Sequence, residues 1–581
     1  MMRWLRPSFK ASYVLLIAAV VGSIALMPSH TTLARTAVGH GTNASGHACV
    51  TAIGSGDNPF TQVFNPYAAP NDFSWGGVYE PLTFYVPSGK RYMWLASKMT
   101  FANGGKTINL TLRQNVTFND GKPFTSADAV YSLEAGKTIN PAFDRIGLLS
   151  KPSNIKSVKA DGAYGVQINL VQADSTFINN FNNVMMLPKH IWTKQTDPTK
   201  WTDPNPVGTG PFKLTRFNNQ EYILTTRKGY WQPMHISCLE RLYESGNDSA
   251  MLSMLNASAD WTHNFVQDVQ HVYVSRDPAH FHYWYSTISG PIGLMMDDTK
   301  YPYSIKALRE AISMVIDRQH VYSVGEYGYE PPAGALGIEH QYPKWIDPKL
   351  VKQDKALAPT NGTAAAMAKN VTAAKALLTK AGFTWNGSGA LIDPKGNAVN
   401  LEPHVISGWT DWVASLKIIT QNLQQGLGIN VNLVLDPDWG TWWPIANTQS
   451  QTTLLWTYSG GPTPYEAFNE FFNPANVTAS GTDEETPGDW AHFADPSALP
   501  LLNQWAHTYS KKTQLALAYK LEAKQLSDFP YIPVMVGAVW FTYSTKYYTG
   551  WPDQKHPYAN GEWGAGTSDW IPILSHLQPA K

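Results

Sequence analysis

The sequence contains little cysteine and little charge for its length. It has 581 residues, of which 2 are cysteine and 15% are charged, against roughly 25% charged residues in an ordinary soluble domain. Two cysteines are too few for a disulfide scaffold or a cysteine-built metal site. Lys+Arg and Asp+Glu both number 44, and this balance provides neither a basic field for nucleic acid nor an acidic tail. We therefore expect no nucleic-acid partner.

Motifs of the common catalytic classes are also missing. The sequence has no G-x-S-x-G elbow, no G-x-x-x-x-G-K-[ST] loop, no H-E-x-x-H and no C-x-x-C. His280 and His282 have the spacing of one strand face, but we expect no metal site there. Acids such as Asp297 and Asp298 keep a glycosidase conceivable, although no spacing selects an acid/base pair. We predict no enzymatic activity and no cofactor, with a secreted carbohydrate-active enzyme as the alternative.

The first 48 residues have the pattern of an export signal followed by a leader. Three basic residues precede an apolar run at 13–27, which is shorter than the roughly 20 residues of a membrane helix. Thr32 and Ala34 supply the small residues that a signal peptidase reads. We predict a signal peptide at 1–34 and a flexible leader at 35–48, with an uncleaved anchor as the alternative. The protein is then exported, to the periplasm or to the outer face of the cytoplasmic membrane.

Aromatic residues are plentiful, at 12% of the chain, and the hydrophobic pattern alternates between strands and helices. This alternation is typical of an α/β protein. Residues 107–112 and 166–171 alternate as strands, and Thr125 with Asp128 forms a capping box between them. Helical stripes are predicted at the following ranges: 305–321, 372–381, 412–423 and 512–526.

Three segments share one layout, in which a short apolar strand runs into an aromatic turn. They are 259–265, 405–412 and 454–462. Ligands of open α/β sheets bind at the carboxyl ends of strands, where tryptophan and tyrosine offer a flat apolar face with a polar tip. We predict that these turns form a ligand surface. The alternative is that the aromatic rings are part of the core.

Each cysteine lies in a strand-like run, Cys49 in ACVTAI and Cys238 in HISCLERLYE. Two cysteines in an exported chain often form a disulfide. Free buried thiols remain the alternative.

Four segments resemble the family 5 extracellular solute-binding proteins of ABC importers, the oligopeptide- and dipeptide-binding group. The most specific is LTLRQNVTFNDGKPFTSADAVYSLE at 110–134, which is similar to the signature of that family. The others are VGTGPFKLTRFNNQEYILTTRKGYW at 207–231, LREAISMVIDR at 308–318 and the A-x-x-L-L-x-x-A-G helix at 371–382. In this order they extend over nearly the whole mature chain.

The resemblance implies an α/β fold of two lobes, the type II periplasmic-binding-protein-like fold, with an extra subdomain on lobe one. Lobe one is expected at 49–290, with its subdomain at about 80–205, and lobe two at 291–536. Residues 537–581 return to lobe one. A small-molecule ligand would bind in the cleft between the lobes, which close over it. The implied partners are a membrane permease with its ATPase, and we expect a monomer that catalyses nothing.

The same resemblance narrows the ligand class. Peptide binders of this family hold the peptide amino group with an aspartate, and Tyr458 falls at about that position in TYSGGPTPYEAF. A buried amine without an acidic partner is costly, although Asp411 or Glu466 could serve instead. SGWTDW, DWTHNF and GWPDQKHPYANG resemble the branch that takes β-linked oligosaccharides such as cellobiose. We predict an oligosaccharide ligand, with an oligopeptide as the alternative.

The predicted ligand-binding residues are aromatic or neutral polar side chains of these turns, together with one acid. They are Trp261, Asn264, Trp409, Asp411, Trp412, Trp439, Trp456, Tyr458 and Trp540.

Overall fold

The computed structural model describes ten stretches of the chain. These are residues 49–54, 58–68, 76–86, 89–138, 154–287, 290–447, 453–457, 461–477, 489–561 and 570–581. The chain divides into two compact units, Met1–Gly41 and Thr42–Lys581, and every described residue belongs to the second. The predicted signal peptide and leader lie outside the described residues, as does Tyr458.

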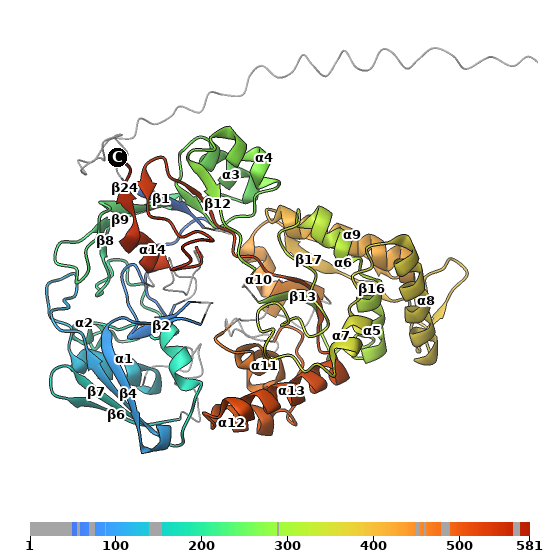
Figure 1. The fold of residues 1–581 in the computed structure, drawn as a ribbon, viewed down its shortest axis with the longest axis horizontal. Coiled ribbons are helices and arrows are strands. Elements are labelled where there is room, and N and C mark those ends of the chain that lie inside the picture. The colour runs from blue at the N-terminus through green and yellow to red at the C-terminus, as the bar shows by residue number, and fades with distance from the viewer. Residues whose placement is uncertain are drawn as a thin grey trace, which may run out of the picture. The chain divides into compact units, whose positions relative to one another are not determined.

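Two sheets define the part of the chain that we call lobe one (Figure 1). The larger has seven strands, in the order β12 (Phe281–Tyr283), β22 (Thr542–Ser544), β11 (Trp261–Thr262), β1 (Val50–Ile53), β10 (Cys238–Leu242), β9 (Glu221–Thr226) and β8 (Phe212–Phe217). The smaller is the subdomain sheet, in the order β4 (Ala96–Ala102), β5 (Thr107–Leu112), β7 (Gly165–Leu170) and β6 (Ile155–Asp161). The helices of this lobe are α1 (Ser126–Thr138), α2 (Lys189–Trp192), α3 (Asn247–Leu255), α4 (Val269–Val272) and α14 (Trp570–His576).

A five-stranded sheet defines lobe two. Its order is β19 (Val434–Asp436), β17 (Pro403–Ile406), β20 (Thr453–Thr457), β13 (Pro291–Met296) and β21 (Ile532–Val536). Strand β17 runs parallel to both β19 and β20, whereas β13 is antiparallel to β20 and β21. The helices of this lobe are α5 (Lys306–Val315), α6 (Arg318–His320), α7 (Val351–Leu357), α8 (Ala364–Lys380), α9 (Thr410–Leu427), α10 (Trp439–Asn447), α11 (Tyr465–Phe472), α12 (Leu499–Ala506) and α13 (Lys511–Asp528).

Four further pairs of short strands complete the described β-strands. They are β2 (Thr83–Tyr85) with β3 (Arg91–Met93), β14 (Thr384–Trp385) with β15 (Leu391–Ile392), β16 (Asn400–Leu401) with β18 (Asn430–Val431), and β23 (Tyr548–Thr549) with β24 (Gln578–Pro579).

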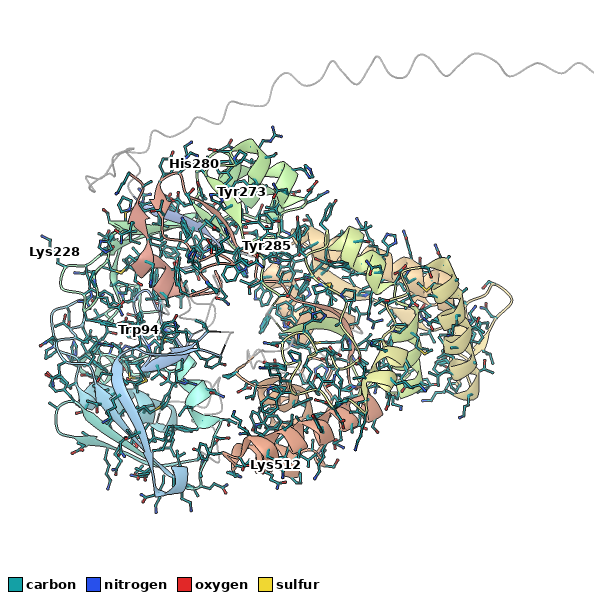
Figure 2. The ribbon with its side chains drawn as sticks, in the orientation of Figure 1. Trp94, Lys228, Tyr273, His280, Tyr285 and Lys512 are labelled. Carbon is teal, nitrogen blue, oxygen red and sulfur yellow. A yellow bond between two sulfur atoms is a disulfide. The ribbon has the colours of Figure 1, made fainter. Side chains whose placement is uncertain are left out.

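The chain passes between the lobes twice, and the described residues of the two crossing segments are 284–287 with 290, and 537–541. The backbone N–H of Val539 donates to the carbonyl of Ser286 at 2.8 Å, and the N–H of Gly537 donates to the carbonyl of Gly290 at 3.1 Å. Figure 2 labels Tyr285 at the start of the first segment. Its ring contacts Trp540 of the second segment at a centroid distance of 4.9 Å. The two segments therefore lie against each other.

Each lobe has its own hydrophobic core. All six residues of β13 are buried, as is typical of a strand covered on both faces. Leu308, Ile312 and Val315 of α5 form the predicted buried stripe of lobe two. Separate cores allow each lobe to keep its packing while the crossing segments bend.

Several local predictions are confirmed. The strand predicted at 107–112 is β5, and the capping box forms, because Thr125 N–H donates to Asp128 Oδ2 at 3.0 Å. Helix α9 ends at Gly428 with φ 73°, a left-handed conformation that glycine adopts without strain. None of the described helices has the length and apolar character needed to cross a bilayer.

The single helix predicted at 305–321 is wrong in its second half. Helix α5 ends at Val315, and Ile316 is extended. The side chain of Asp317 then accepts a hydrogen bond from the N–H of His320 and caps the new turn α6. A capping acid at this position favours a fresh helix start over continuation.

Candidate functional site

Tryptophan side chains gather where three parallel strands of lobe two end. Trp409 follows β17, Trp439 follows β19, and Trp456 lies near the end of β20. Because these strands are neighbours and run in the same direction, their carboxyl ends share one edge of the sheet. That edge is where open α/β sheets bind ligands.

Seven rings make up what we call the tryptophan cluster: Trp409, Trp412, Trp439, Trp442, Trp443, Trp456 and Trp490. Trp409 stacks on Trp456 at a centroid distance of 5.9 Å, and Trp442 stacks on Trp456 at 4.8 Å. Trp412 meets Trp409 edge to face at 5.1 Å. These separations and angles are those that favour aromatic pairs.

The cluster has an inner and an outer part. Trp442 is fully buried and Trp490 nearly so. The other five rings are only partly buried, so their faces or edges reach the surface. The outer rings therefore form an apolar platform with indole N–H groups as possible hydrogen-bond donors. The structure brings four of the predicted residues together here: Trp409, Trp412, Trp439 and Trp456.

Three members of the cluster were absent from the sequence-based site. Trp442 and Trp443 belong with Trp439 to the segment WGTWWP, whose spacing of three and four residues indicates one helix face. That signal was available in the sequence. Trp490 lies far along the chain, and only the tertiary structure brings it to within 5.0 Å of Trp456.

Asp411 and Asn264 belong to a buried polar chain that links the lobes. Asn247 Nδ2 donates to Asp411 Oδ1 at 3.1 Å, and Asn264 Nδ2 donates to Asn247 Oδ1 at 3.3 Å. Thr262 Oγ1 donates to Asn264 Oδ1 at 2.6 Å. Asp411 and Asn264 are both buried. Their polar atoms are therefore engaged with protein groups from both lobes.

Two further acids share the environment of Asp411. Ser415 Oγ donates to Glu326 Oε1 at 2.6 Å, and the N–H of Ala538 in the second crossing segment donates to Glu330 Oε1 at 2.8 Å. Burial raises the pKa of Asp411 to about 6. Burial and the neighbouring carboxylates raise the pKa of Glu326 and that of Glu330 well above the usual range. These shifts have one main cause, because burial disfavours the charged form of a carboxyl group.

Glu466, the other acid considered for a ligand amine, is also occupied. Asn179 Nδ2 of lobe one donates to Glu466 Oε1 at 2.8 Å, and Thr463 Oγ1 donates to Glu466 Oε2 at 3.1 Å. Burial raises the pKa of Glu466, and these hydrogen bonds partly lower it again. Asn179 also accepts from Arg91 Nη2 at 2.8 Å.

Trp261 and Trp540 lie away from the tryptophan cluster. Trp261 is 0% exposed and packs edge to face on Phe541 and Trp551, at 5.9 and 5.6 Å. It is a core side chain of lobe one, in contrast to the prediction that it faces a ligand. Trp540 is partly buried and packs on Phe265 at 5.2 Å beside the crossing segments.

Cys49 and Cys238 are joined by a disulfide with an S–S distance of 1.97 Å. The bond links the start of β10 to the residue before β1, and these two strands are parallel neighbours. It therefore closes a loop of sequence separation 189 within lobe one.

The described residues contain no group of three or more His, Cys, Asp or Glu side chains suited to a metal ion. His280, labelled in Figure 2, has its Nδ1 atom 2.9 Å from Asp277 Oδ1. His282 Nε2 lies 3.2 Å from Thr545 Oγ1.

The fold and the site define a two-lobed binding protein, and comparison with known proteins gives its family. The family of bacterial extracellular solute-binding proteins, family 5, matches residues 90–479. This match extends over more than half of the chain, and the chain belongs to that family.

Two curated relatives illustrate the breadth of the family. The nickel-binding periplasmic protein of Escherichia coli is 25% identical over 64% of this chain and 68% of its own length. The glutathione-binding protein GsiB of Salmonella paratyphi A is 26% identical over 45% of this chain and 51% of its own length. The second match thus extends over only about half of that relative.

Solved structures share the fold along nearly the whole chain. A periplasmic oligopeptide-binding protein of Thermotoga maritima, with mannohexaose bound, has a TM-score of 0.80 at 23% identity, and the match covers 91% of this chain and 98% of that one. The oligopeptide-binding protein AppA of Bacillus subtilis, in complex with a nonapeptide, has a TM-score of 0.71 at 17% identity, with coverages of 91% and 99%. The predicted two-lobed α/β fold is confirmed.

Proposed function

We propose that this protein is the exported solute-binding component of an ABC importer that captures a neutral, β-linked oligosaccharide. The ligand would bind between the lobes and be delivered to a membrane permease with its ATPase. We further propose that the protein acts as a monomer, without catalysis. The observation that carries the ligand class is the tryptophan cluster at the carboxyl ends of β17, β19 and β20.

The chemistry of the outer tryptophan rings suits a sugar. A pyranose ring presents an apolar C–H face that stacks on an indole, while its hydroxyl groups need neutral hydrogen-bond partners. Trp409 and Trp456 stack with an interplanar angle of 30°, and both are partly exposed. A ligand with several flat, uncharged rings matches such a platform.

The state of the two candidate acids favours a neutral ligand over a peptide amine. Asp411 accepts from Asn247, and Glu466 accepts from Asn179 and Thr463. Burial disfavours the charged form of both acids and raises the pKa of each. A cationic amine would have to displace these hydrogen bonds inside the protein, which is costly.

The solved structures with this fold hold ligands of two classes, an oligosaccharide and a peptide. The Thermotoga maritima protein, although named for oligopeptides, holds mannohexaose, which supports the capacity of this fold for an oligosaccharide. The nonapeptide complex of AppA favours the alternative, an oligopeptide-binding component. A secreted carbohydrate-active enzyme is the alternative from another class.

Calorimetry on the ligand-free protein tests the proposal. Cellotriose, a tripeptide and the same tripeptide with an acetylated amino group are titrated under identical conditions. We expect saturable heat with the sugar and none with either peptide. Tight tripeptide binding that acetylation abolishes, with no heat from the sugar, would replace the proposal with an oligopeptide importer. Release of shorter sugars, measured by chromatography of the cellotriose mixture, would point to the enzyme.

A further inference from the structure

The lobes also touch each other at a place far along the chain from the crossing segments, apart from the contacts of Asp411 and Glu466. The N–H of Ser175, after β7 of the subdomain sheet, donates to the carbonyl of Ala506 at the end of α12 at 2.7 Å. Ser175 Oγ also accepts from Gln514 Nε2 of α13 at 3.2 Å. Figure 1 shows α12 at the lower end of lobe two, on the side of the subdomain sheet, whereas β12 lies near the top of the picture.

Tyr509 is the central side chain of this contact. Its hydroxyl donates to the carbonyl of Asp174 at 3.2 Å, and its ring meets Phe101 edge to face at 6.3 Å. The ring also covers Gly105, where an added Cβ would lie 2.5 Å from Tyr509 Cε2. Only a residue without a side chain leaves room for this approach.

Both sides of the contact are held in shape within their own lobes. On lobe one, Asp174 Oδ1 accepts from the N–H and the hydroxyl of Thr176, at 2.9 and 2.7 Å. On lobe two, Gln514 is buried and its Nε2 donates to the carbonyl of Thr508 at 3.0 Å. Two preformed surfaces can dock and separate without refolding.

We propose that this contact is a latch that holds the lobes closed, with Tyr509 as its main side chain. The latch consists of Gly105, Asp174 and Ser175 of lobe one and of Ala506, Tyr509 and Gln514 of lobe two. The inference rests on the proposed function as a binding protein that opens and closes. Its consequence is a population of closed protein without any ligand, which sets how fast a bound ligand leaves.

The small size of the contact suits a reversible latch. Tyr509 is 49% and Phe101 44% exposed, so little apolar surface is removed from water when the lobes meet. The hydrogen bond from the Tyr509 hydroxyl to Asp174 is exposed and competes with water. The latch therefore biases the equilibrium between open and closed forms and still permits release.

Spin labels report the closed population without any ligand. Lys159 of β6 and Lys369 of α8 are exposed and lie on different lobes. Lys159→Cys and Lys369→Cys would take the labels, because the native cysteines are bonded to each other. Pulsed dipolar spectroscopy then measures the distance distribution in the full protein.

We expect a main short distance in the labelled parent and at least a tenfold fall in the ratio of closed to open protein in Tyr509→Ala. Tyr509→Phe, which keeps the ring over Gly105 and loses the bond to Asp174, should lie between the two. Tyr519→Ala is the matched control, because Tyr519 of α13 packs against the core of lobe two and should leave the distribution unchanged.

The latch is overturned if Tyr509→Ala keeps the distribution of the parent, if Tyr519→Ala shifts it equally, or if the ligand-free parent has no closed population. None of these outcomes depends on the ligand class. A failed sugar titration and a failed latch are therefore distinguishable.

Discussion

Residues 260–265 in lobe one and 407–412 in lobe two have a similar sequence pattern, but their tryptophan side chains differ in exposure to solvent. Both place a tryptophan near the end of a short apolar strand and before polar residues. Trp261 is fully buried between β1 and β22, whereas Trp409 is partly exposed at the edge of the lobe-two sheet. The two segments are nevertheless connected, because Asn264 and Asp411 both hydrogen bond to Asn247.

The position of each ring relative to its strand explains the difference. Trp261 is the first residue of β11, an inner strand of its sheet, and Phe541 and Trp551 pack against its ring. Trp409 comes three residues after β17 ends and directly precedes α9. A ring inside a central strand belongs to the core, and a ring beyond the end of a strand lies at the binding edge.

The largest expected effect is on folding, at Trp261. Trp261→Ala removes a fully buried indole from the core of lobe one, where large-to-alanine changes cost about 3–5 kcal/mol of unfolding free energy. Chemical denaturation followed by circular dichroism measures the loss. Affinity for the best oligosaccharide, measured where the variant is folded, should stay within twofold. A stable variant with abolished binding would mean that Trp261 contacts the ligand.

Much of the fold could be predicted because its signals are local. The alternation at 107–112 and the capping box at Thr125 and Asp128 need only neighbouring residues, and both form. The helix at 305–321 was too long because Asp317 can either continue a helix or cap a new one. That choice depends on tertiary packing, which the hydrophobic period does not contain.

The site was only partly predictable, for a different reason. The turns at 259–265 and 405–412 could be recognised, but the packing of Phe541 and Trp551 on Trp261, which buries its ring, could not. The occupancy of Glu466 depends on Asn179, 287 residues away. Tyr458 remains a prediction, because it lies outside the described residues.

A smaller effect is expected at Asp411, which links the two compared segments. Burial raises its pKa in the folded protein to about 6, above roughly 3.9 in the unfolded chain. The folded state therefore binds more protons between about pH 4 and 6. Stability from this group is present below about pH 4 and is lost as the pH rises to about 6.

Asp411→Asn isolates this contribution. The amide oxygen can still accept from Asn247, while the buried charge is removed. The variant should gain stability relative to the parent as the pH rises from about 4 to about 6, by at most about 3 kcal/mol, and by less where Glu326 and Glu330 titrate with it. Urea unfolding at several pH values gives the two curves. Parallel curves across that interval would contradict the assignment.

The smallest expected effect in free energy is on binding, at Trp409. Trp409→Ala removes one outer ring of the tryptophan cluster and should weaken oligosaccharide binding at least tenfold, about 1.4 kcal/mol, since a stacked aromatic contact contributes on that scale. Trp385→Ala is the control, because Trp385 is also partly buried in lobe two but bonds the carbonyl of Leu427 instead. Calorimetry with cellotriose compares the variants. If the affinity of Trp409→Ala stays within twofold of the parent, Trp409 does not contact the ligand. Trp409 and Trp261 would then differ only in how their rings pack.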